Sequence, residues 1–477
     1  MAACVQVPDF QLLSVGPFDS SAQRIVTNGR HAPQTERDNS AFVHARITLL
    51  SYQLAMHILL IGSGGREHAM AWKLAQSPDV SRISVAPGNP GMLHEAKIEL
   101  VSIDVSDIAG LRSFAQSEDV HLTVVGPEAP LVAGIVDDFS AHDLRIFGPH
   151  QAGAQLEGSK AFAKDFMARN NIPTAAYDTF REIEPARAFI EKHGAPIVIK
   201  ADGLAAGKGV VVAQDKQEAL AAVESMLGGQ FGDAGAQLVI EEFLAGEEAS
   251  FIAVVSGRDC LALATSQDHK ARDEGDTGPN TGGMGAYSPA PVVTDAVHAH
   301  VMKDIVQPTI NALADEGMPF TGFLYVGLMI DNSGSARVVE YNVRLGDPET
   351  QPLMMRMQSD LLPLLDHAVD GTLSQATISW RAGSAIGIVM AAGEYPAGSS
   401  HGKPITGIED AESGQCKVFH AGTRLEDQQL VTAGGRVLCV TATGDSLAQA
   451  KQRAELGATC IFWEGCRYRR DIGHRAL

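Results

Sequence analysis

A carboxylate, an amide and a guanidinium alternate along the stretch EYNVRLGDPET at residues 340–350. Because successive side chains of a strand point to opposite faces, Glu340, Asn342 and Arg344 should share one face. The first two are hard oxygen donors about 7 Å apart along the backbone, and Mg²⁺ binds such oxygens together with those of phosphates. The arginine could neutralise a phosphoryl group during its transfer. The alternative is a solvated strand face with a Glu–Arg pair, worth about 0.2–1 kcal/mol.

The side chains between these three are apolar and predict the opposite face of the same strand. We expect them to point into a hydrophobic core: Val339, Tyr341, Val343 and Leu345. The Gly-Asp-Pro that follows should end the strand. One face of the strand is therefore core, and the other is either a binding site or solvated surface.

Two glycine-rich loops follow apolar runs and could bind phosphates. The first, Gly62-Ser-Gly-Gly65, separates an expected strand from an expected helix, and amides at a helix start bind anions well. It is a poor match to the dinucleotide fingerprint G-x-G-x-x-G, because Glu67 stands where the third glycine should. A tight turn without a ligand is the alternative.

The second loop, KADGLAAGKG at residues 200–209, lies between two expected strands. It resembles a Walker A loop, but three residues instead of four separate Gly203 from Gly207, and Gly209 replaces the required Ser or Thr. Such a hairpin could cover a nucleotide, with its amides on the phosphates and Lys200 below them. A flexible hairpin in solvent is the alternative.

Two further segments are rich in groups that bind small polar molecules. Residues 238–250, LVIEEFLAGEEAS, predict a strand, a hinge and a strand. The backbone of Glu242–Leu244 could pair with a purine edge, and Glu248 could accept from ribose hydroxyls; a solvated acidic hinge is the alternative. Residues 268–285, DHKARDEGDTGPNTGGMG, form a long charged loop of the kind that is usually a functional lid or disordered. We expect a lid whose partners are small and polar.

The composition predicts a globular protein of several domains that acts on small molecules. The chain has 477 residues, is 45% hydrophobic and carries a formal net charge of −20, which argues against nucleic acids and anionic membranes as partners. Its six cysteines include no C-x-x-C pair and no Cys–His cluster at zinc spacing. No apolar run reaches the roughly 18 residues of a membrane span. We therefore expect reduced thiols and a cytoplasmic location.

Four segments differ in their patterns. Residues 1–55 show no sustained period and fit neither a signal nor a transit peptide, so we expect a disordered extension. Residues 56–157 alternate apolar runs with helical stretches, which predicts a parallel sheet with helical crossovers. Residues 158–365 are richer in strands and glycines, and residues 383–477 mix strands with one helix. The fold class is therefore α/β together with α+β.

Seven segments, in this order, closely resemble the phosphoribosylamine–glycine ligase family of ATP-grasp enzymes: GSGGREHA, GPEAPL, LEGSKAF, KADGLAAGKGV, EEFLAGEEASF, GPNTGGMGAYSP and EYNVRLGDPETQ. The resemblance covers about residues 56–477. It implies a Rossmann-like domain at 56–157, a two-lobed ATP-grasp domain at 158–365 with a lid lobe at about 177–248, and a C-terminal α+β domain at 383–477. It also implies ATP-dependent ligation of glycine to 5-phosphoribosylamine through glycyl phosphate, which gives glycinamide ribonucleotide, ADP and phosphate in purine biosynthesis.

The same resemblance implies roles for individual residues. ATP would be bound by lysines, a glycine loop and a hinge: Lys160, Lys200, Asp202, Gly203, Gly207, Lys208, Gly209, Glu242, Phe243, Leu244 and Glu248. Mg²⁺ or Mn²⁺ would be held by Glu340 and Asn342. The residues that act on the transferred phosphate would be Arg344 and Lys200. Phosphoribosylamine would lie near Gly64, Gly65, Arg66, Asp347 and Glu349.

The chain departs from the family's usual pattern at two positions. Ala271 stands where arginine usually follows His-Lys, with Arg272 one place later, so the contact of that arginine is not carried over. Leu345 replaces a phenylalanine in the expected core face, where it should repack at modest cost.

Three other functions remain open. The first is another ATP-grasp carboxylate–amine ligase or carboxylase that acts on a different acid. The second is a nicotinamide dehydrogenase, which the incomplete G-x-G-x-x-G disfavours. The third is a nucleotide-binding regulatory protein, which would leave the alternating Glu, Asn and Arg unexplained. In every case we expect a monomer or a weak homo-oligomer, with ATP as a co-substrate in the ligase.

Overall fold

The computed structural model describes residues 56–204, 209–230 and 232–477. The first part of this chain forms a parallel sheet. The extension expected at residues 1–55 lies outside the described residues. The strand order, β3-β2-β1-β4-β5, reverses at β1, and every pairing is parallel. The carboxyl end of β1 therefore lies at a switch point, where such sheets bind ligands. The strands are β1 (Met56–Gly62), β2 (Val80–Pro87), β3 (Ile98–Leu100), β4 (Leu122–Val125) and β5 (Ile146–Phe147).

Helices connect these strands and cover the sheet, which explains why β1 is buried along almost its whole length. They are α2 (Gly65–Ala75), η1 (Pro90–His94), α3 (Ile108–Ser117), α4 (Glu128–Val132), α5 (Ile135–Ser140) and α6 (Gln151–Gly158). The helix α2 begins directly after the first glycine loop, as the sequence predicted.

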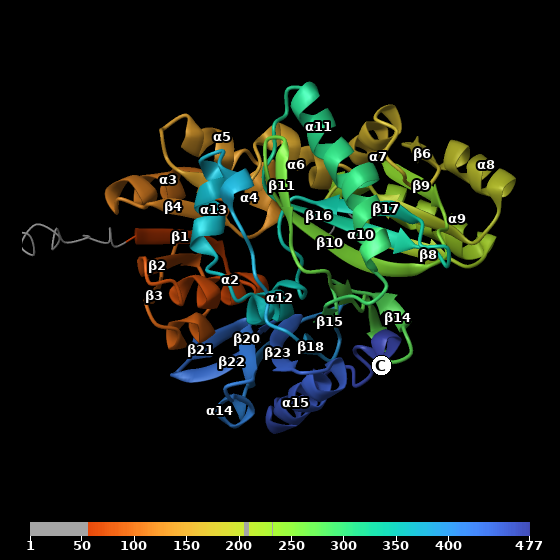
Figure 1. The fold of residues 1–477 in the computed structure, drawn as a ribbon. Coiled ribbons are helices and arrows are strands. Elements are labelled where there is room, and N and C mark those ends of the chain that lie inside the picture. Colours follow the sequence, from red (N-terminus) through yellow and green to blue (C-terminus); the bar gives the residue numbers. More distant parts are fainter. Residues whose placement is uncertain (1–55, 205–208, 231) are drawn as a thin grey trace, which may run out of the picture. The chain divides into compact units, whose positions relative to one another are not determined.

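The segment expected to form a lid lobe contains a four-stranded antiparallel sheet in the order β6-β9-β7-β8. Two helices, α8 and α9, pack against this sheet and against each other (Figure 1). The elements are β6 (Tyr177–Phe180), α8 (Ile183–His193), β7 (Ile197–Ala201), β8 (Val210–Ala213), α9 (Lys216–Ser225), η2 (Met226–Gln230), η3 (Gly232–Gly235) and β9 (Leu238–Glu242). Gly207 and Lys208, between β7 and β8, lie outside the described residues.

A second antiparallel sheet, β11-β10-β16-β17, carries the stretch with the alternating polar side chains. The helices α10 and α11 pack on this sheet through apolar residues of a shared core (Figure 1). The elements are α7 (Lys160–Arg169), β10 (Glu247–Ser256), β11 (Asp259–Ala262), α10 (Asp295–Val301), η4 (Met302–Val306), α11 (Gln307–Asp315), β16 (Thr321–Ile330) and β17 (Ala336–Asn342).

The pleat of β17 differs from the expected one at a single residue. The pairing with β16 shifts register between Val338 and Glu340, so Val339 is an extra, bulged residue. The prediction that Val339 packs in the core is wrong: Val338 is buried there, and Val339 lines a cavity. The three apolar residues after the bulge are buried as expected: Tyr341, Val343 and Leu345.

The last sheet combines strands from two distant segments. The strands β12 (Gln267–Asp268) and β15 (Gly285–Ser288) flank the charged loop, and they extend a sheet in the order β12-β15-β18-β23-β20. The ends of this loop are therefore built into the C-terminal sheet. The remaining elements are β13 (Ala271–Asp273), β14 (Thr277–Asn280), α12 (Thr350–Arg356), α13 (Leu362–Val369), η5 (Leu373–Gln375), β18 (Ser384–Ala392), β19 (Ser400–Pro404), α14 (Ile408–Ala411), β20 (Cys416–His420), β21 (Thr423–Glu426), β22 (Gln429–Gly434), β23 (Arg436–Gly444), α15 (Leu447–Cys460), β24 (Cys466–Arg467) and η6 (His474–Ala476).

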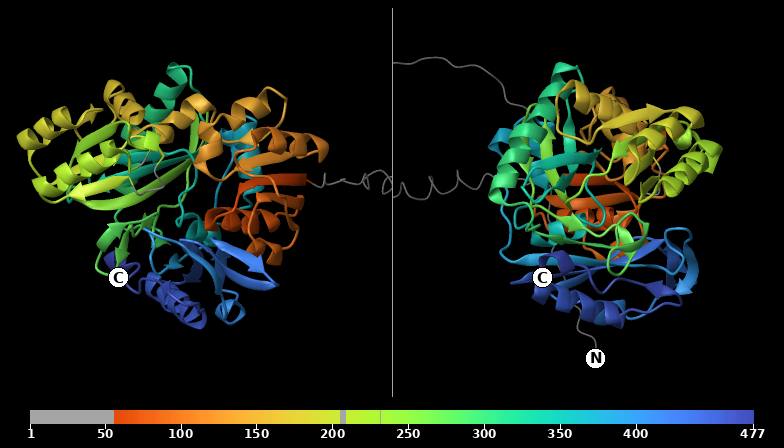
Figure 2. Two further views of the ribbon diagram at one scale, coloured as in Figure 1. Left: turned by 180° about the vertical axis from the view of Figure 1, so that it is seen from behind. Right: turned by 90° about the vertical axis from the view of Figure 1, so that its right-hand side faces the viewer.

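The long helix α15 packs along β18 and β23 and covers one face of this sheet (Figure 2). Parallel strands with crossover helices and antiparallel sheets with helices on one face coexist in the chain, which confirms the predicted α/β and α+β fold class. Within the described residues, no helix combines the length and the hydropathy that crossing a bilayer requires.

Candidate active site

A cavity of about 410 Å³ is lined by residues of both antiparallel sheets, of the N-terminal domain and of the C-terminal sheet. Its size suits a nucleotide-sized ligand. Although the whole chain is acidic, cations gather here beside the carboxylates. The charged lining residues are Arg66, Glu128, Glu157, Lys160, Lys164, Lys200, Glu241, Glu242, Glu248, Asp268, Lys270, Glu340, Arg344, Asp347, Glu349 and Arg436.

Two lysines share one buried carboxylate in the part of the cavity formed by β7 and β9. The Nζ of Lys200 lies 2.8 Å from Glu241 Oε1, and the Nζ of Lys164 lies 2.9 Å from Oε2. Lys200 also donates to the carbonyl oxygen of Val339 at 3.1 Å, which ties the lid lobe to β17. Burial lowers the pKa of Lys164 to about 8, against the attraction of Glu241. Two cations and one anion leave a net positive charge, which suits phosphate oxygens.

Lys160 begins α7 beside these lysines, and two residues predicted to contact ATP hold it there. Asp202 Oδ1 accepts from the amide of Ala161 at 2.7 Å and from Ser159 Oγ at 3.0 Å, so this carboxylate caps the start of α7. Lys160 Nζ donates to the carbonyl oxygen of Gly203 at 3.1 Å and lines the cavity. In this structure Asp202 and Gly203 therefore position Lys160.

The predicted hinge, residues 242–244, begins at the last residue of β9, continues towards β10 and lines the cavity. The side chain of Phe243 is 40% exposed, and an exposed aromatic ring beside a cavity offers a surface for a flat base. Glu242 forms an ion pair with an arginine of β17 on the exposed rim. Glu248 instead pairs with Lys270 within the cavity.

Glu340 and Asn342 project from β17 into the cavity. The Nζ of Lys270 lies 3.4 Å from Glu340 Oε1. Lys270 lowers the pKa of Glu340 to about 2, with Lys200 acting in the same direction against burial. The carboxylate is therefore ionised at neutral pH. Asn342 Oδ1 accepts from Arg344 Nη2 at 3.1 Å, and Glu340 lines the same cavity as these two side chains.

The oxygen atoms of this pair fit a divalent cation. Carboxylate and amide oxygens are the hard ligands that Mg²⁺ and Mn²⁺ take, and the carboxylate carries its charge. In the part of the chain that the structure describes, no three His, Cys, Asp or Glu side chains are placed to hold a metal ion by themselves. A cation bound to Glu340 and Asn342 would therefore complete its shell with oxygens of a substrate or of water.

Arg344 is held next to this pair by two carboxylates. Its Nη2 lies 2.5 Å from Glu157 Oε1, and its Nε lies 3.3 Å from Glu128 Oε2. Burial alone would lower the pKa of Arg344, but these carboxylates raise it above its usual value, so the guanidinium stays charged. Burial raises the pKa of Glu157 to about 7, although Arg344 opposes the shift. The guanidinium of Arg344 is therefore a positive charge that is fixed in position inside the cavity.

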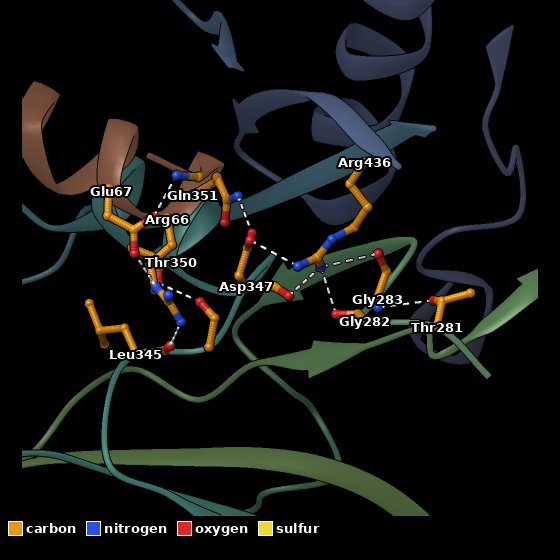
Figure 3. A network of polar contacts seen from close by, with 12 residues as sticks. Arg66, Glu67, Thr281, Gly282, Gly283, Leu345, Asp347, Thr350, Gln351 and Arg436 are labelled. Atoms are coloured by element: carbon orange, nitrogen blue, oxygen red, sulfur yellow. Dashed lines mark hydrogen bonds and ion pairs between the residues drawn. The ribbon is translucent and has the colours of Figure 1, made fainter. Parts of the chain in front are cut away.

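Asp347 connects three parts of the molecule (Figure 3). Arg436 of β23 donates to the carbonyl oxygen of Asp347 at 2.5 Å and lies 3.0 Å from Oδ2, while Gln351 donates to Oδ1 at 2.7 Å. Arg436 also donates to the carbonyl oxygen of Gly282 at 2.6 Å. Burial alone would raise the pKa of Asp347, but Arg436 and Arg66 hold it below its usual value. Asp347 is therefore an ionised carboxylate fixed from several sides.

The first glycine loop brings Arg66 to the same region (Figure 3). Arg66 Nη1 donates to the carbonyl oxygen of Leu345 at 3.1 Å, and its Nε donates to Glu67 Oε1 at 2.6 Å. The amide of Gly64 donates to Glu67 Oε2 at 2.7 Å, so Glu67 already takes one of the amides that an anion could use. A Cβ at Gly65 would lie 2.7 Å from Nε2 of the Gln351 side chain, so a larger residue there would require that side chain to shift.

A wall rich in carboxylates lies elsewhere in the cavity. Glu349 Oε1 accepts from Ser250 Oγ at 2.8 Å and from Tyr325 Oη at 2.9 Å. Asp268 lines the same cavity, and burial raises its pKa well above the usual value despite the attraction of Lys270. Neighbouring buried carboxylates repel each other unless one is protonated or a cation joins them. This wall therefore suits a small cationic group.

Most of the site residues predicted from the sequence line this one cavity: Lys160, Lys200, Gly209, Glu242, Phe243, Leu244, Glu248, Arg66, Glu340, Asn342, Arg344, Asp347 and Glu349. Others lie beside it without lining it: Gly64, Gly65, Asp202 and Gly203. Gly207 and Lys208 are outside the described residues. The roles assigned to all of them stay predictions.

Sequence reasoning missed several charged residues of the cavity: Glu128, Glu157, Lys164, Glu241, Asp268, Lys270 and Arg436. One signal was available for Lys164, because it lies four positions after Lys160 and so shares a helix face with it. Asp268 and Lys270 begin the charged loop, which the sequence singled out without assigning a role to either. Arg436 gave no signal, since it meets Asp347 only where β23 packs against the loop before α12.

Comparison with known proteins places the three domains in one family. Residues 56–157, 158–350 and 385–475 match the N domain, the ATP-grasp (A) domain and the C domain of phosphoribosylglycinamide synthetase. A curated phosphoribosylamine–glycine ligase from Allochromatium vinosum is 59% identical over 423 residues, which are 88% of this chain and 99% of that protein.

Solved structures agree with this assignment. The crystal structure of phosphoribosylamine–glycine ligase from Thermotoga maritima is 33% identical with a TM-score of 0.74, and the match covers 87% of this chain and 100% of that one. A biotin carboxylase from Campylobacter jejuni, in complex with β,γ-ATP, is 14% identical with a TM-score of 0.65 over 87% of this chain and 93% of that one, which shows a shared fold alone. The resemblance found in the sequence is thus confirmed, and the chain belongs to the phosphoribosylglycinamide synthetase family, that of the phosphoribosylamine–glycine ligases.

Proposed function

We propose that this chain uses ATP to join glycine to 5-phosphoribosylamine, forming glycinamide ribonucleotide, ADP and phosphate in de novo purine biosynthesis. One observation carries the proposal. A single cavity contains an oxygen pair suited to a cation, a fixed guanidinium and buried lysines, in a chain 59% identical to a curated ligase of that name.

ATP would lie between the lid lobe and β17. The cationic group formed by Lys160, Lys164 and Lys200 faces the cavity, where it can hold phosphate oxygens. The hinge at residues 242–244 offers backbone groups to the purine and the ring of Phe243 to its face. The nucleotide would therefore be held at both of its ends.

The terminal phosphate would meet β17. Mg²⁺ or Mn²⁺ would be held by Glu340 and Asn342, where it would neutralise and orient phosphate oxygens. Arg344 is already fixed by two carboxylates, so it needs no reorganisation to stabilise charge that develops during transfer. Lys270 bonds Glu248 and Glu340 at once, which fixes the two carboxylates relative to each other.

Glycine and phosphoribosylamine would occupy different ends of the remaining space. The wall with Asp268 and Glu349 suits the ammonium group of glycine. Arg66, near the start of α2 and Asp347, suits the phosphate of phosphoribosylamine, because a helix start and a guanidinium both favour anions.

The chemistry requires positioned charges and no nucleophilic side chain. A carboxylate oxygen of glycine attacks the terminal phosphorus of ATP, the bond to ADP breaks, and glycyl phosphate forms. The amine nitrogen of phosphoribosylamine then attacks the carbonyl carbon, the bond to phosphate breaks, and the nitrogen loses one proton. Each step moves negative charge between groups that face fixed cations, so the protein contributes orientation and electrostatic stabilisation.

Release of ADP, measured in a coupled assay with each substrate omitted in turn, tests this function. We expect full release only with glycine and phosphoribosylamine together, and none when bicarbonate or a D-amino acid replaces glycine. Equal release with bicarbonate would instead favour the carboxylase alternative, and release independent of phosphoribosylamine would contradict the proposal. Mass spectrometry of the product should show glycinamide ribonucleotide.

A further inference from the structure

The C-terminal tail, residues 467–477, lies against the loop formed by residues 268–282 (Figure 1). The two segments are far apart in the sequence. The tail does not line the cavity, whereas the loop contributes Asp268, Lys270 and residues 280–282 to its wall. The tail therefore touches the cavity only through this loop.

Two contacts hold residues 269–271, near the start of the loop. The amide of Gly473 donates to His269 Nε2 at 3.2 Å, and the imidazole is fully buried. Arg469 Nη1 donates to the carbonyl oxygen of Ala271 at 2.9 Å. Both contacts reach residues adjacent to Lys270, so they fix the backbone on either side of it.

The tip of the loop is held by charges. Asp276 pairs with three side chains of the tail: Arg469 at 3.0 Å, Arg475 at 2.8 Å and His474 at 3.3 Å. Arg475 Nη1 also reaches the carbonyl oxygen of Asp268 at 3.5 Å. The tail thus binds the loop at its tip and at its start.

Arg469 is the central residue of these contacts. Its side chain is 1% exposed, and it donates to both oxygens of Asp471 at 2.7 and 2.6 Å. Asp471 Oδ2 in turn accepts from the amide of Gly275 at 2.8 Å. A buried guanidinium between Asp471 and Asp276 has little freedom to move, because both partners fix its plane.

The opposite side of residues 268–271 faces the cavity. Asp268 and Lys270 line it, whereas the residues that alternate with them face the tail. The amide and the Oγ1 of Thr281 both donate to the carbonyl oxygen of Lys270 at 2.8 Å. Lys270 is therefore clamped from two sides while its ammonium group contacts Glu248 and Glu340.

We propose that Arg469 is a positioning residue for the ligase reaction, which sets the place of Lys270 in the cavity through the backbone of the loop. This inference rests on the proposed function. The chain's distant end would then adjust the charges that surround the transferred phosphate, and a displacement of about 1 Å there can lower turnover by on the order of 10²-fold.

The first experiment compares Arg469→Met with a matched control in the full-length protein. Arg453 also donates to a backbone carbonyl oxygen, that of Thr443 at 2.6 Å, but within the C-terminal sheet and away from the loop. We expect Arg469→Met to lower kcat by on the order of 10- to 100-fold. The affinity for a non-hydrolysable ATP analogue should change far less than kcat, because the tail contacts described above go to the loop and not to the lysines or the hinge proposed to hold ATP. Arg453→Met should leave kcat unchanged, and Arg469→Lys should restore part of it.

A double-mutant cycle tests whether the effect passes through Lys270. In a Lys270→Met background the position of that side chain no longer matters, so adding Arg469→Met should change kcat far less than it does in wild type. A merely structural role for Arg469 would instead give the same fold-change in both backgrounds.

Amide hydrogen exchange tests the inference separately from activity, because Arg469→Met could also lose activity through general unfolding. We expect faster exchange of the amides at residues 269–284 and unchanged exchange in the lid lobe. The inference is overturned by wild-type kcat in Arg469→Met, by an equal loss in Arg453→Met, by additivity in the cycle, or by exchange that increases throughout the chain. A wild-type chain without substrate-dependent ADP release would overturn the proposed function instead.

Discussion

The two ends of the cavity are built in different ways. At the end where we propose that ATP binds, called the ATP end below, Lys200 projects from β7, and Glu340 and Asn342 project from β17. At the other end, Asp347 lies in the loop before α12 and is fixed by Arg436 from a distant sheet (Figure 3). The alternation of side chains along a strand determines where the residues at the ATP end point. Packing between distant segments determines the position of Asp347.

This difference affects how each end should respond to substitution. A side chain on a strand can be removed while the backbone stays in place, so the loss is local. A side chain that joins two domains holds backbone as well as charge, so its removal should displace several groups together. Four predictions test this contrast.

The largest effect is expected at the ATP end. Glu340→Ala should lower kcat by on the order of 10²-fold or more, because it removes one of the two oxygen ligands proposed for the metal-bound phosphate. Steady-state ADP release is the measurement, with the unfolding transition recorded in parallel to show that the fold is retained. Glu316→Ala is the matched control, since that carboxylate pairs with Arg169 on the surface. Turnover near wild type in Glu340→Ala would exclude the metal assignment.

At the other end, the cross-domain pair should behave as one unit. Asp347→Asn and Arg436→Met should each raise the KM for phosphoribosylamine by on the order of 10-fold, because each breaks a half-buried charge pair that fixes the loop before α12. The double variant should be little worse than either single one. Lys403→Met, which removes an exposed ion pair of the same domain, provides the control. Independent, multiplying effects of the two substitutions would show that the residues do not act together.

The sequence predicted the ATP end better for the same physical reason. Alternation along a strand was enough to place Glu340, Asn342 and Arg344 on one face. The same alternation gave the wrong side for Val339, because this residue lies in a β-bulge. A bulge depends on the partner strand and leaves no periodic pattern in the sequence. The parallel sheet and the C-terminal strands also followed from apolar runs.

The contacts that complete the site could not be predicted in this way. Arg436 meets Asp347 across 89 positions, and Arg344 meets Glu157 across 187. No local pattern in the sequence specifies which of many charged residues will pair over such separations. Asp202, whose contact with ATP stays a prediction from the family resemblance, adds a further example, because its Oδ1 accepts from the amide of Ala161 across 41 positions.

A smaller effect should appear in the pH dependence of stability. Burial, with Arg475 and Arg469 adding to it, lowers the pKa of His269 to about 3. The imidazole is therefore neutral in the folded chain, whereas in the unfolded chain it binds a proton below a pH of about 6.5. The free energy of unfolding should fall as the pH drops from about 6.5 towards 3, by up to about 1.4 kcal/mol per pH unit.

His269→Gln isolates this contribution. A glutamine oxygen can still accept from the amide of Gly473, but it does not titrate. Urea unfolding between neutral pH and about pH 5 should therefore show a flatter dependence for the variant than for wild type. Carboxylates such as Asp276 titrate in both proteins and cancel in the comparison. Parallel curves for the two proteins would mean that His269 does not contribute.

The smallest effect is expected at Leu345, which lies in the hydrophobic core just before the loop that carries Asp347. This side chain is buried in the core, while its carbonyl oxygen accepts from Arg66. Leu345→Phe adds volume to a packed region that includes flexible methionines, so it should lower the free energy of unfolding by about 1–2 kcal/mol. Because the backbone contact is unchanged, kcat and the KM for phosphoribosylamine should both stay at wild-type values. A raised KM would show that core packing, and not only the charge network, positions the loop that carries Asp347.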